Sequence, residues 1–371
     1  MTLVVFLTYG TSLDDWKNAG LLTREIKLYK KLSNLGWEII LVTYGDETDK
    51  AISLPENITI VPLFDGWVRP QNRVLRFILS LFILFVIRAK IPKHAVLKCK
   101  QMYGAWFPAI LCFLSGRKFL FRYGFDDIHF RSNLGKKSFY ELINKWLVLW
   151  SLKRASSVVV TTKNDLVRFR EHVPRYNNGI YVIPNWVDVN EFRPRNNLVN
   201  PHRILFIGRL VTQKNLEKLI SALNGSNFGI DLYGKGPLRQ TLVQQAKLFG
   251  VDLKIYDPVS HEELPYIFNQ YKLFCLPSLF EGNPKVLLEA MASGNIVLGT
   301  EVEGIKELIQ HKQNGILLKP DLSDLHSNLE MIISDKQLQS LVSKNAVEYI
   351  KKFHCFEYLA KREHELLTSM L

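Results

Sequence analysis

Cysteine is scarce in this 371-residue chain, and its few copies form no pattern. There is no Cys-x-x-Cys pair and no Cys/His group at the spacing of metal ligands, since the thiols lie far apart at Cys99, Cys112, Cys275 and Cys355. A zinc site or a disulfide framework is therefore disfavoured, and a reducing compartment is expected. The start of the chain also lacks the basic residues and long apolar core of a signal peptide, which predicts a buried first strand and a cytoplasmic protein.

Long apolar runs and common nucleotide-binding motifs are absent as well. The uncharged run Phe77–Ile87 has 11 residues, fewer than the ~20 that a membrane-spanning helix needs. No Gly-x-Gly-x-x-Gly and no Gly-x-x-x-x-Gly-Lys-Ser/Thr sequence occurs, which disfavours a nicotinamide-binding or P-loop site. What the chain does have is a 47% hydrophobic composition, enough for sizeable cores, and a length that predicts two domains of ~150 residues or more.

Acidic residues are missing from one long stretch, and this makes the charge uneven. Residues 1–185 contain 27 Lys and Arg against 14 Asp and Glu, whereas residues 186–371 contain 21 of each. The net charge of +13 therefore belongs to the first half. Between Asp65 and Asp126 there are eleven basic residues and no acidic one. A surface of one sign attracts an anionic partner, such as a membrane or a nucleic acid.

The run Phe77–Ile87 allows two interpretations. It suits a helix lying at a membrane interface, with flanking cations reaching the headgroups, and it equally suits a buried helix of an α/β domain. A nucleic-acid partner is disfavoured, because no nucleic-acid-binding motif accompanies the charge. The residues expected to form the membrane-facing or acceptor-facing surface are Arg69, Arg73, Arg76, Arg88 and Lys90.

Apolar runs alternate with helical patterns along both halves, which predicts two doubly wound parallel α/β domains enclosing a cleft. The expected divisions are an N-terminal domain over 1–185, a C-terminal domain over 186–350, and a helix over 351–371 packing back on the first domain. Strands are predicted at 3–8, 38–44, 58–63, 95–99, 118–122, 157–161, 180–183, 203–207, 229–233, 252–256, 273–276, 295–299 and 315–318. Helices are predicted at 19–35, 71–89, 104–115, 136–153, 215–224, 236–249, 261–270, 284–294, 303–310 and 321–334.

Two segments of the second half contain candidate ligand-binding residues. In the first, Gly208 follows an apolar strand and is followed by Arg209 and Lys214, an arrangement that suits a diphosphate but is also ordinary turn chemistry. In the second, a strand leads into a loop with Glu281 and then into a helix that contains Glu289. Glu289 lies among apolar residues, so it is expected to be buried and to need a hydrogen-bond partner such as a ribose diol.

Together these segments resemble the GT-B glycosyltransferases of family 4, a retaining class. The resemblance rests on Gly208-Arg209, Lys214-Asn215 and the Glu281…Glu289 spacing, and extends to the segments at 183–194, 233–237, 259–264 and 300–308. It implies a GT-B fold and transfer of a sugar from a UDP- or GDP-sugar with retention of configuration. No Asp-x-Asp occurs, so the resemblance implies that neither a metal nor any other cofactor is required.

The resemblance also assigns roles to residues. Arg209 and Lys214 would stabilise the leaving diphosphate, Glu281 would bind the donor sugar, and Glu289 would bind the ribose. Further donor contacts are expected at Gly10, Gly208, Val259, Gly282, Asn283, Pro284, Lys285 and Val286. In the first domain the family's His-Gly is replaced by Tyr123-Gly124. Asp126 is then the nearest candidate for holding the acceptor hydroxyl, with a turn or capping role as its alternative.

The expected partner is therefore a nucleotide-diphosphate sugar, and the acceptor is a glycan. The basic first domain favours a lipid-linked or envelope glycan and peripheral attachment to the inner face of the cytoplasmic membrane. Three alternatives remain at this point: an epimerase or phosphorylase of the same fold, a soluble transferase with a small acceptor, and a catalytically silent membrane-binding subunit.

Overall fold

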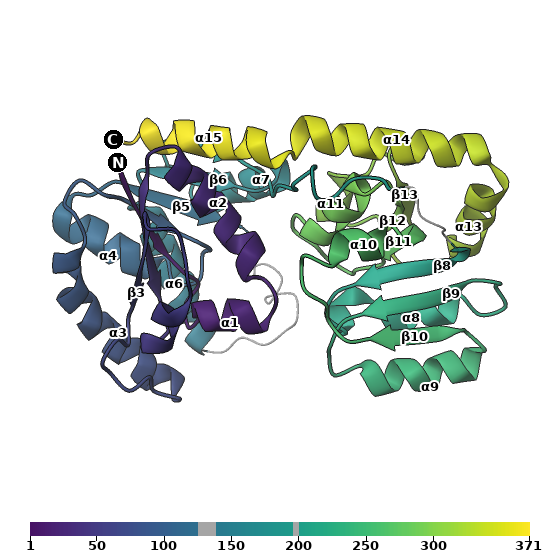
Figure 1. The fold of residues 1–371 in the computed structure, drawn as a ribbon, viewed down its shortest axis with the longest axis horizontal. Helices are drawn as coiled ribbons and strands as arrows, with labels where there is room; N and C mark the ends of the chain where they lie inside the picture. The colour runs from purple at the N-terminus through teal and green to yellow at the C-terminus, as the bar shows by residue number, and fades with distance from the viewer. Residues whose placement is uncertain (125–138, 196–199) are drawn as a thin grey trace. The chain divides into compact units, whose positions relative to one another are not determined.

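The computed structural model describes residues 1–124, 139–195 and 200–371, which form two compact units (Figure 1). Unit 1 comprises Met1–Ile183 and Ala360–Leu371, and unit 2 comprises Pro184–Leu359. Each unit contains a parallel sheet whose strands alternate with helices along the chain. The predicted fold class, two doubly wound α/β domains, is confirmed.

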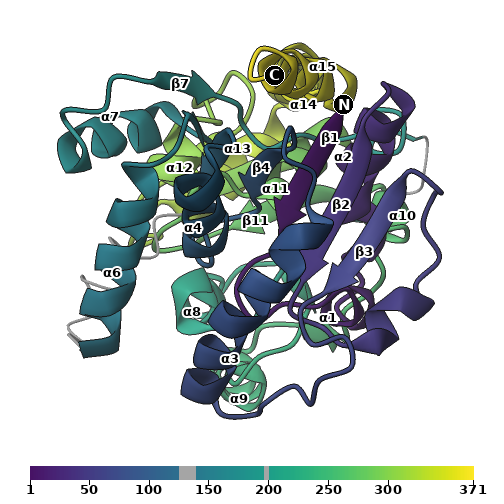
Figure 2. The same ribbon diagram turned by 90° about the vertical axis from the view of Figure 1, so that its left-hand side faces the viewer.

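In its described residues, unit 1 has a seven-stranded sheet in the order β3-β2-β1-β4-β5-β6-β7, part of which is visible in Figure 2. The order reverses between β1 and β4, so the loops that follow these two strands flank the point where ligands bind in open parallel sheets. The strands are β1 (Thr2–Phe6), β2 (Glu38–Thr43), β3 (Ile58–Pro62), β4 (Val96–Cys99), β5 (Phe119–Tyr123), β6 (Ser157–Val160) and β7 (Gly179–Val182).

The helices of unit 1 follow local capping signals. The helix predicted over 19–35 is α2, which begins at Leu22 because Gly20, at φ +65°, separates it from α1, an additional short helix that the capping box of Ser12 and Asp15 starts. The segments are α1 (Leu13–Asn18), α2 (Leu22–Asn34), η1 (Glu47–Ala51), α3 (Arg73–Ile87), η2 (Arg88–Lys90), α4 (Trp106–Ser115), α6 (Phe139–Leu152) and α7 (Lys163–His172), of which α1 and α7 were not predicted.

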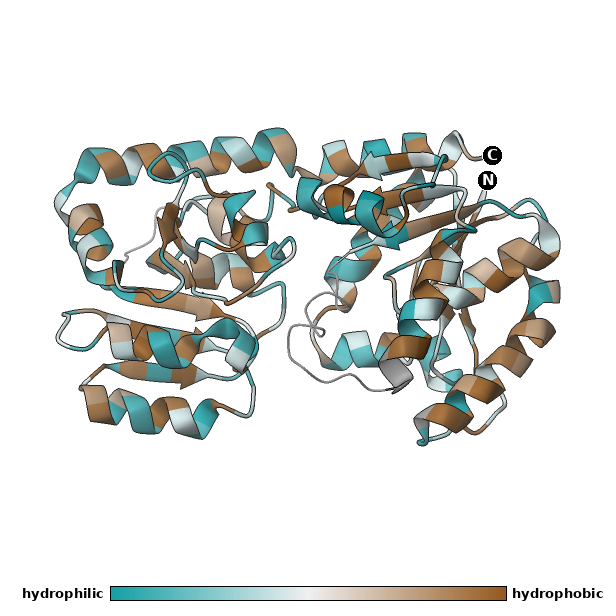
Figure 3. Ribbon diagram, turned by 180° about the vertical axis from the view of Figure 1, so that it is seen from behind, coloured by the Kyte–Doolittle hydropathy of each residue, from teal (hydrophilic) through white to brown (hydrophobic). Residues whose placement is uncertain are grey.

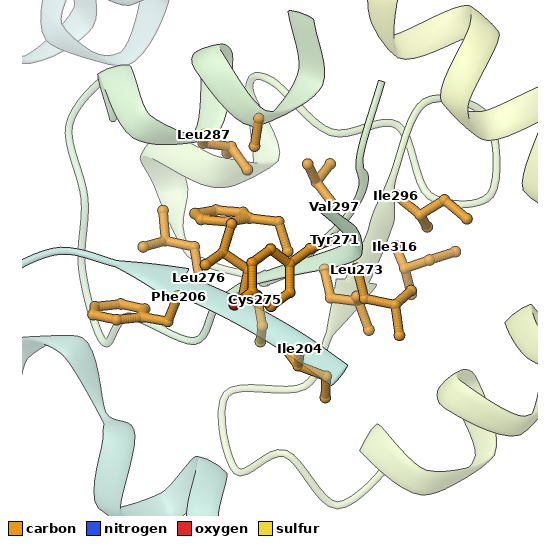
Figure 4. Close-up of a cluster of buried hydrophobic side chains, with 14 of the residues drawn as sticks. Ile204, Phe206, Tyr271, Leu273, Cys275, Leu276, Leu287, Ile296, Val297 and Ile316 are labelled. Atoms are coloured by element: carbon orange, nitrogen blue, oxygen red, sulfur yellow. The ribbon is translucent and has the colours of Figure 1, made fainter. Parts of the chain in front are cut away.

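Unit 2 has a six-stranded parallel sheet in its described part, in the order β10-β9-β8-β11-β12-β13. Apolar side chains of β8, β11, β12 and β13 fill its core (Figure 4). The strands are β8 (Asn200–Ile207), β9 (Gly229–Tyr233), β10 (Leu253–Tyr256), β11 (Tyr271–Leu276), β12 (Ile296–Thr300) and β13 (Ile316–Leu318). The helices are η3 (Thr212–Lys214), α8 (Leu216–Ala222), α9 (Arg239–Phe249), α10 (Leu264–Phe268), α11 (Lys285–Ala292), α12 (Glu303–Lys306), α13 (Leu325–Ser334) and α14 (Lys336–Phe353).

The end of the chain is not one helix over 351–371. Helix α14 ends at Phe353, and α15 (Phe356–Thr368) begins three residues later. The interruption has a local cause, because the backbone at Val187 bonds to both sides of it: its N–H donates to His354 and its carbonyl accepts from Phe356. The division between the two units falls within α15, so that residues from Ala360 onward belong to unit 1.

Buried charges attach α15 to the sheet of unit 1. Lys98 of β4 forms an ion pair with Glu363 of α15, and the two side chains are only 3% and 4% exposed. Arg122 of β5 lies 3.9 Å from the same carboxylate. Burial alone would raise the pKa of Glu363, but the positive charges of Lys98 and Arg122 outweigh it and hold the pKa below its usual value. The carboxylate is therefore ionised in the folded protein.

Removing the charge of Glu363 should destabilise unit 1. We expect Glu363→Gln to lower the free energy of unfolding by about 3–5 kcal/mol, because Lys98 is left buried without its partner. The combined Lys98→Met/Glu363→Leu variant should recover most of this loss. Chemical denaturation at pH 7 measures both effects, and equal stability of wild type and Glu363→Gln would contradict the assignment.

The same pair predicts a pH dependence. Since the folded-state pKa of Glu363 is lowered, its contribution is complete above the unfolded pKa of about 4.3 and is lost as the pH falls through the folded value. The stability of the wild type should therefore fall relative to that of the combined variant on acidification below pH 4.

Candidate functional site

The candidate site of unit 2 lies where its strand order reverses, between β8 and β11. These strands are parallel neighbours, so the loops at their carboxyl ends emerge at the same edge of the sheet. The loop after β8 contains Arg209 and Lys214, and the loop after β11 contains Glu281. The fold thus brings together two segments that are about 70 residues apart in sequence.

Glycines allow the neighbouring loops to approach closely. The N–H of Gly208 donates to the carbonyl of Tyr233 at 3.0 Å. A Cβ at Gly234 would overlap the carbonyl oxygen of Gly208, so only glycine fits at that position. Gly236 is held in the same way against the carbonyl of Leu210. This packing fixes the loop after β8 and leaves Arg209 exposed beyond it.

The two oppositely charged side chains of these loops are paired. The ammonium of Lys214 donates to Oε1 of Glu281, and the side chains are 12% and 8% exposed. The hydroxyl of Ser278 donates to the same oxygen at 2.6 Å. Asn215, at φ +53°, turns the chain from η3 into α8 and so sets the direction of the lysine. The ion pair therefore orients the ammonium of Lys214 at the carboxyl-terminal edge of the sheet.

Glu289 is buried, as predicted, at 3% exposure within α11. Its Oε1 lies 2.9 Å from Nε2 of His261, and the imidazole packs against the ring of Phe192 at 5.2 Å. Within the protein, this acid therefore has a histidine as a hydrogen-bond partner, and its expected contact with a ribose diol stays a prediction. His261 comes from the segment between β10 and α10, next to the half-buried Val259.

The loop from Glu281 to α11 is held from both sides. A Cβ at Gly304 would overlap the carbonyl oxygen of Gly282. The side-chain amide of Asn185 donates to the carbonyl of Asn283 at 2.6 Å, and the N–H of Asn185 donates to Oδ1 of Asn283 at 3.1 Å. The loop is therefore well fixed where α11 begins.

Pro284 was predicted as the first residue of that helix, and it is instead the residue that precedes it. Its backbone is extended, at φ −70° and ψ 111°, and the helix starts at Lys285. The ammonium of Lys285 lies 5.7 Å from the centre of the Trp186 ring. Val286 is half-buried against the core. The first-turn N–H groups of α11 point back toward the Glu281 loop, as helix geometry requires.

Unit 1 has a corresponding edge after β1 and β4. Gly10 follows β1 with φ +81°, and its carbonyl accepts a hydrogen bond of 2.8 Å from Arg69. Next to it, the N–H of Tyr9 donates to the carbonyl of Tyr103 at 3.0 Å. Aromatic rings surround this loop, and burial together with Tyr9 and Tyr103 raises the pKa of Tyr44 well above its ordinary value.

The basic residues predicted to form a surface divide into two groups. Arg69 and Arg76 bond to backbone carbonyls of unit 1, whereas Arg88 and Lys90 are exposed. The side chain of Arg73 and all of Asp126 lie outside the described residues. Tyr123, at the end of β5, is buried edge-on against Phe169.

Sequence reasoning missed three residues that organise the site of unit 2: Ser278, His261 and Asn185. Ser278 and Asn185 are common polar residues without a distinctive spacing. His261 had a weak signal, because a histidine precedes two acids in the loop that the resemblance places near the nucleotide base. Across residues 1–124, 139–195 and 200–371, no cluster of three or more His, Cys, Asp or Glu side chains could hold a metal ion.

Two family profiles match the chain in succession. The profile of "Glycosyltransferase Family 4" matches residues 23–191, and that of "Glycosyl transferases group 1" matches residues 188–349. The two matches meet where unit 1 passes into unit 2.

Curated relatives are similar over part of their length. The chain is 30% identical to an uncharacterized glycosyltransferase of Methanocaldococcus jannaschii over 43% of this chain and 42% of the relative. It is 28% identical, over 40% and 44%, to the GalNAc-alpha-(1->4)-GalNAc-alpha-(1->3)-diNAcBac-PP-undecaprenol alpha-1,4-N-acetyl-D-galactosaminyltransferase of Campylobacter jejuni. It is 24% identical, over 57% and 59%, to the UDP-Gal:alpha-D-GlcNAc-diphosphoundecaprenol alpha-1,3-galactosyltransferase of Escherichia coli. The chain thus spans about half the length of these relatives.

Solved structures match over the whole chain. Sucrose-phosphate synthase from Thermosynechococcus elongatus superposes with a TM-score of 0.85 at 18% identity, covering 100% of this chain and 99% of the other. HepE of Anabaena in complex with UDP superposes with a TM-score of 0.78 at 18% identity, covering 100% of both chains. These similarities show the fold.

The contact between His261 and Glu289 can be tested without a substrate. We expect His261→Phe to keep the ring packing against Phe192 and to lower the free energy of unfolding by about 1–3 kcal/mol, because a buried carboxylate loses a hydrogen bond. His261→Gln, which carries an amide donor near the position of Nε2, should lose less. Chemical denaturation measures all three proteins, and a smaller loss in His261→Phe than in His261→Gln would show that packing, rather than the hydrogen bond, matters.

Proposed function

This chain belongs to the GT-B glycosyltransferases of family 4, and from that premise we propose that it transfers a sugar from a UDP- or GDP-sugar to a glycan acceptor with retention of configuration. The observation that carries the proposal is the Lys214–Glu281 pair at the switch point of unit 2. It lies where an open parallel sheet binds its ligand. No metal or other cofactor is part of the proposal.

The reaction breaks the bond between the anomeric carbon and the β-phosphate of the donor, so negative charge grows on the leaving diphosphate. Arg209 is exposed at the loop after β8, and Lys214 is oriented by Glu281 next to it. Both cations, with the first N–H groups of α11, would stabilise that charge. The diphosphate would accept the proton of the acceptor hydroxyl, so no strong general base is needed.

The two glutamates divide the binding of the donor. Glu281 would accept hydrogen bonds from donor-sugar hydroxyls with the oxygen that Lys214 and Ser278 leave free. Glu289 would bind the ribose, with His261 holding its carboxylate in place. The further donor contacts expected from the sequence lie around these groups. They belong to loops at Gly208, Val259, Gly282, Asn283 and Pro284, to the first turn of α11 at Lys285 and Val286, and to the loop after β1 of unit 1 at Gly10. Asp126 stays a proposal for the acceptor side.

For the acceptor, we propose a lipid-linked or envelope glycan at the inner face of the cytoplasmic membrane. Two relatives support this, because their names place their acceptors on undecaprenol. A helix with the length and apolar character to cross a bilayer is not found in the part of the chain that the structure describes. An epimerase or phosphorylase is not favoured, because the relatives whose names state a reaction are transferases.

Replacing Arg209 should abolish most turnover while the fold is kept. We expect Arg209→Ala to lower kcat by about a hundred- to a thousand-fold, because the variant lacks a cationic hydrogen-bond donor that stabilises the charge on the leaving diphosphate. Arg239→Ala, an exposed arginine on α9, is the matched control and should keep wild-type turnover. Release of nucleoside diphosphate from UDP- and GDP-sugars, assayed in EDTA, measures the effect. Wild-type turnover in Arg209→Ala would remove the assignment, and activity only after metal addition would remove metal independence.

The stereochemistry gives an independent test. With a UDP-α-sugar and an acceptor glycan, we expect an α-linked product, observed by the anomeric coupling constant in proton NMR. A β-linked product would overturn the proposed retention and leave the donor site untouched. Calorimetry with UDP and GDP separates a transferase from a silent subunit, because no binding of either at millimolar concentration would favour the silent subunit.

A further inference from the structure

Helix α3 has one buried face and one exposed face, although almost every residue in it is apolar. Ser80, Ile83, Leu84 and Ile87 are at most 4% exposed and lie on the side that faces the core of unit 1. The helix has a capping Asn72 at its start, whose side chain accepts from the N–H groups of Val74 and Leu75. The buried-helix interpretation of this run therefore holds for one side of the helix, and the other side is exposed.

The other side forms an apolar stripe. Six large apolar residues are between 52% and 63% exposed: Val74, Leu75, Ile78, Phe82, Phe85 and Val86. At 3.6 residues per turn they fall within an arc of roughly 120°, and the stripe is about 18 Å long. Trp67, 45% exposed, packs edge-on against Phe82 at 6.3 Å and widens it. These seven residues are called the α3 face, and Figure 3 shows that the helix is mostly apolar.

Cations flank the α3 face, and no acidic residue lies near it in the sequence between Asp65 and Asp126. The structure reduces the eleven basic residues of this stretch to a smaller exposed set. Lys98 and Arg122 pair with Glu363, and Lys100 pairs with Glu25. Arg117 donates to two backbone carbonyls. Among the side chains of this stretch that the structure describes, the exposed cations are Arg88 and Lys90, directly after α3, together with Lys93 and Lys118.

We propose that the α3 face inserts into the interfacial layer of an anionic lipid bilayer, with Arg88, Lys90 and Lys93 contacting the headgroups. An apolar stripe bordered by cations is the pattern of a helix that lies in the membrane surface. A second copy of the chain fits less well, because two such faces in contact would bring like charges together without an acid to balance them. Exposed apolar patches of this kind mark interaction surfaces in soluble domains.

The insertion would bring the loop after β1 to the membrane. The ring centres of Phe77 of α3 and Tyr9 are 6.2 Å apart. The guanidinium of Arg76 would lie 3.6 Å from a Cβ atom placed on Gly10. The first turns of α3 therefore hold the loop of unit 1 that is expected to line the transfer site. In this respect the inference rests on the proposed function, since a lipid-linked acceptor would reach that loop from the bilayer. Lipid binding itself does not depend on it.

Flotation with vesicles tests the proposal on the full chain without nucleotide. The vesicles are phosphatidylcholine alone or with 30% phosphatidylglycerol, at about 0.1 M salt. We expect the wild type to float with the anionic vesicles only. Ile78→Ser/Phe82→Ser should reduce the bound fraction at least ten-fold, and Arg88→Ser/Lys90→Ser/Lys93→Ser should do so as well. Leu248→Ser, which changes an even more exposed leucine on α9 of unit 2, is the control and should float like the wild type.

Three results would overturn the proposal: wild type that does not float, apolar variants that float unchanged, or a wild-type dimer in sedimentation that becomes monomeric in Ile78→Ser/Phe82→Ser without any lipid binding. Circular dichroism and thermal unfolding confirm that the variants are folded, which is expected for exposed positions. Calorimetry with UDP and GDP on the same variants separates the two hypotheses. Normal donor binding without flotation rejects the α3 face alone, whereas flotation without donor binding rejects the proposed transfer reaction alone.

Discussion

The close approach of loops at the carboxyl ends of parallel strands is the constraint on which the site of unit 2 depends. Backbone carbonyls of Gly208 and Gly282 lie where any Cβ on Gly234 or Gly304 would overlap them. Because these contacts are backbone to backbone, they fix the loops whatever the neighbouring side chains do. Lys214 and Glu281 then meet as an ion pair, and two flexible side chains become one oriented group.

Buried charge has different consequences in the two units. In unit 1, Lys98 and Glu363 are almost fully buried and join the last helix to the sheet, so their role is structural. In unit 2, Glu289 with His261 and Glu281 with Lys214 lie at the edge where ligands bind. An ionic pair in a core stabilises little beyond an apolar one, whereas a pair at a binding edge also presents hydrogen-bonding atoms to a ligand. Position in the sheet decides between the two roles.

In the basic stretch between Asp65 and Asp126, tertiary contacts determine which of the charged side chains are exposed. Taken as a sequence, its eleven cations form one continuous field. In the fold, several of them form ion pairs with Glu25 or Glu363 or donate to backbone carbonyls. The exposed cations among the described side chains come after α3 in the sequence. The sequence could not divide that helix into an inner and an outer face. In the fold, its exposed apolar face is a more distinctive feature of the surface than the basic residues.

The sequence by itself determined the fold class, the positions of nearly all predicted strands and the two motifs of the second half, because periodicity and loop residues are local properties. It also placed Glu281 and Glu289 correctly in a loop and a buried helix. Only the tertiary structure decided which side chains meet: His261 with Glu289, Ser278 with Glu281, and Asn185 with Asn283. It also divided the last helical stretch between Phe353 and Phe356, because the backbone there pairs with Val187, far away in the chain. Contacts between distant residues follow from strand order and packing, which no local pattern specifies.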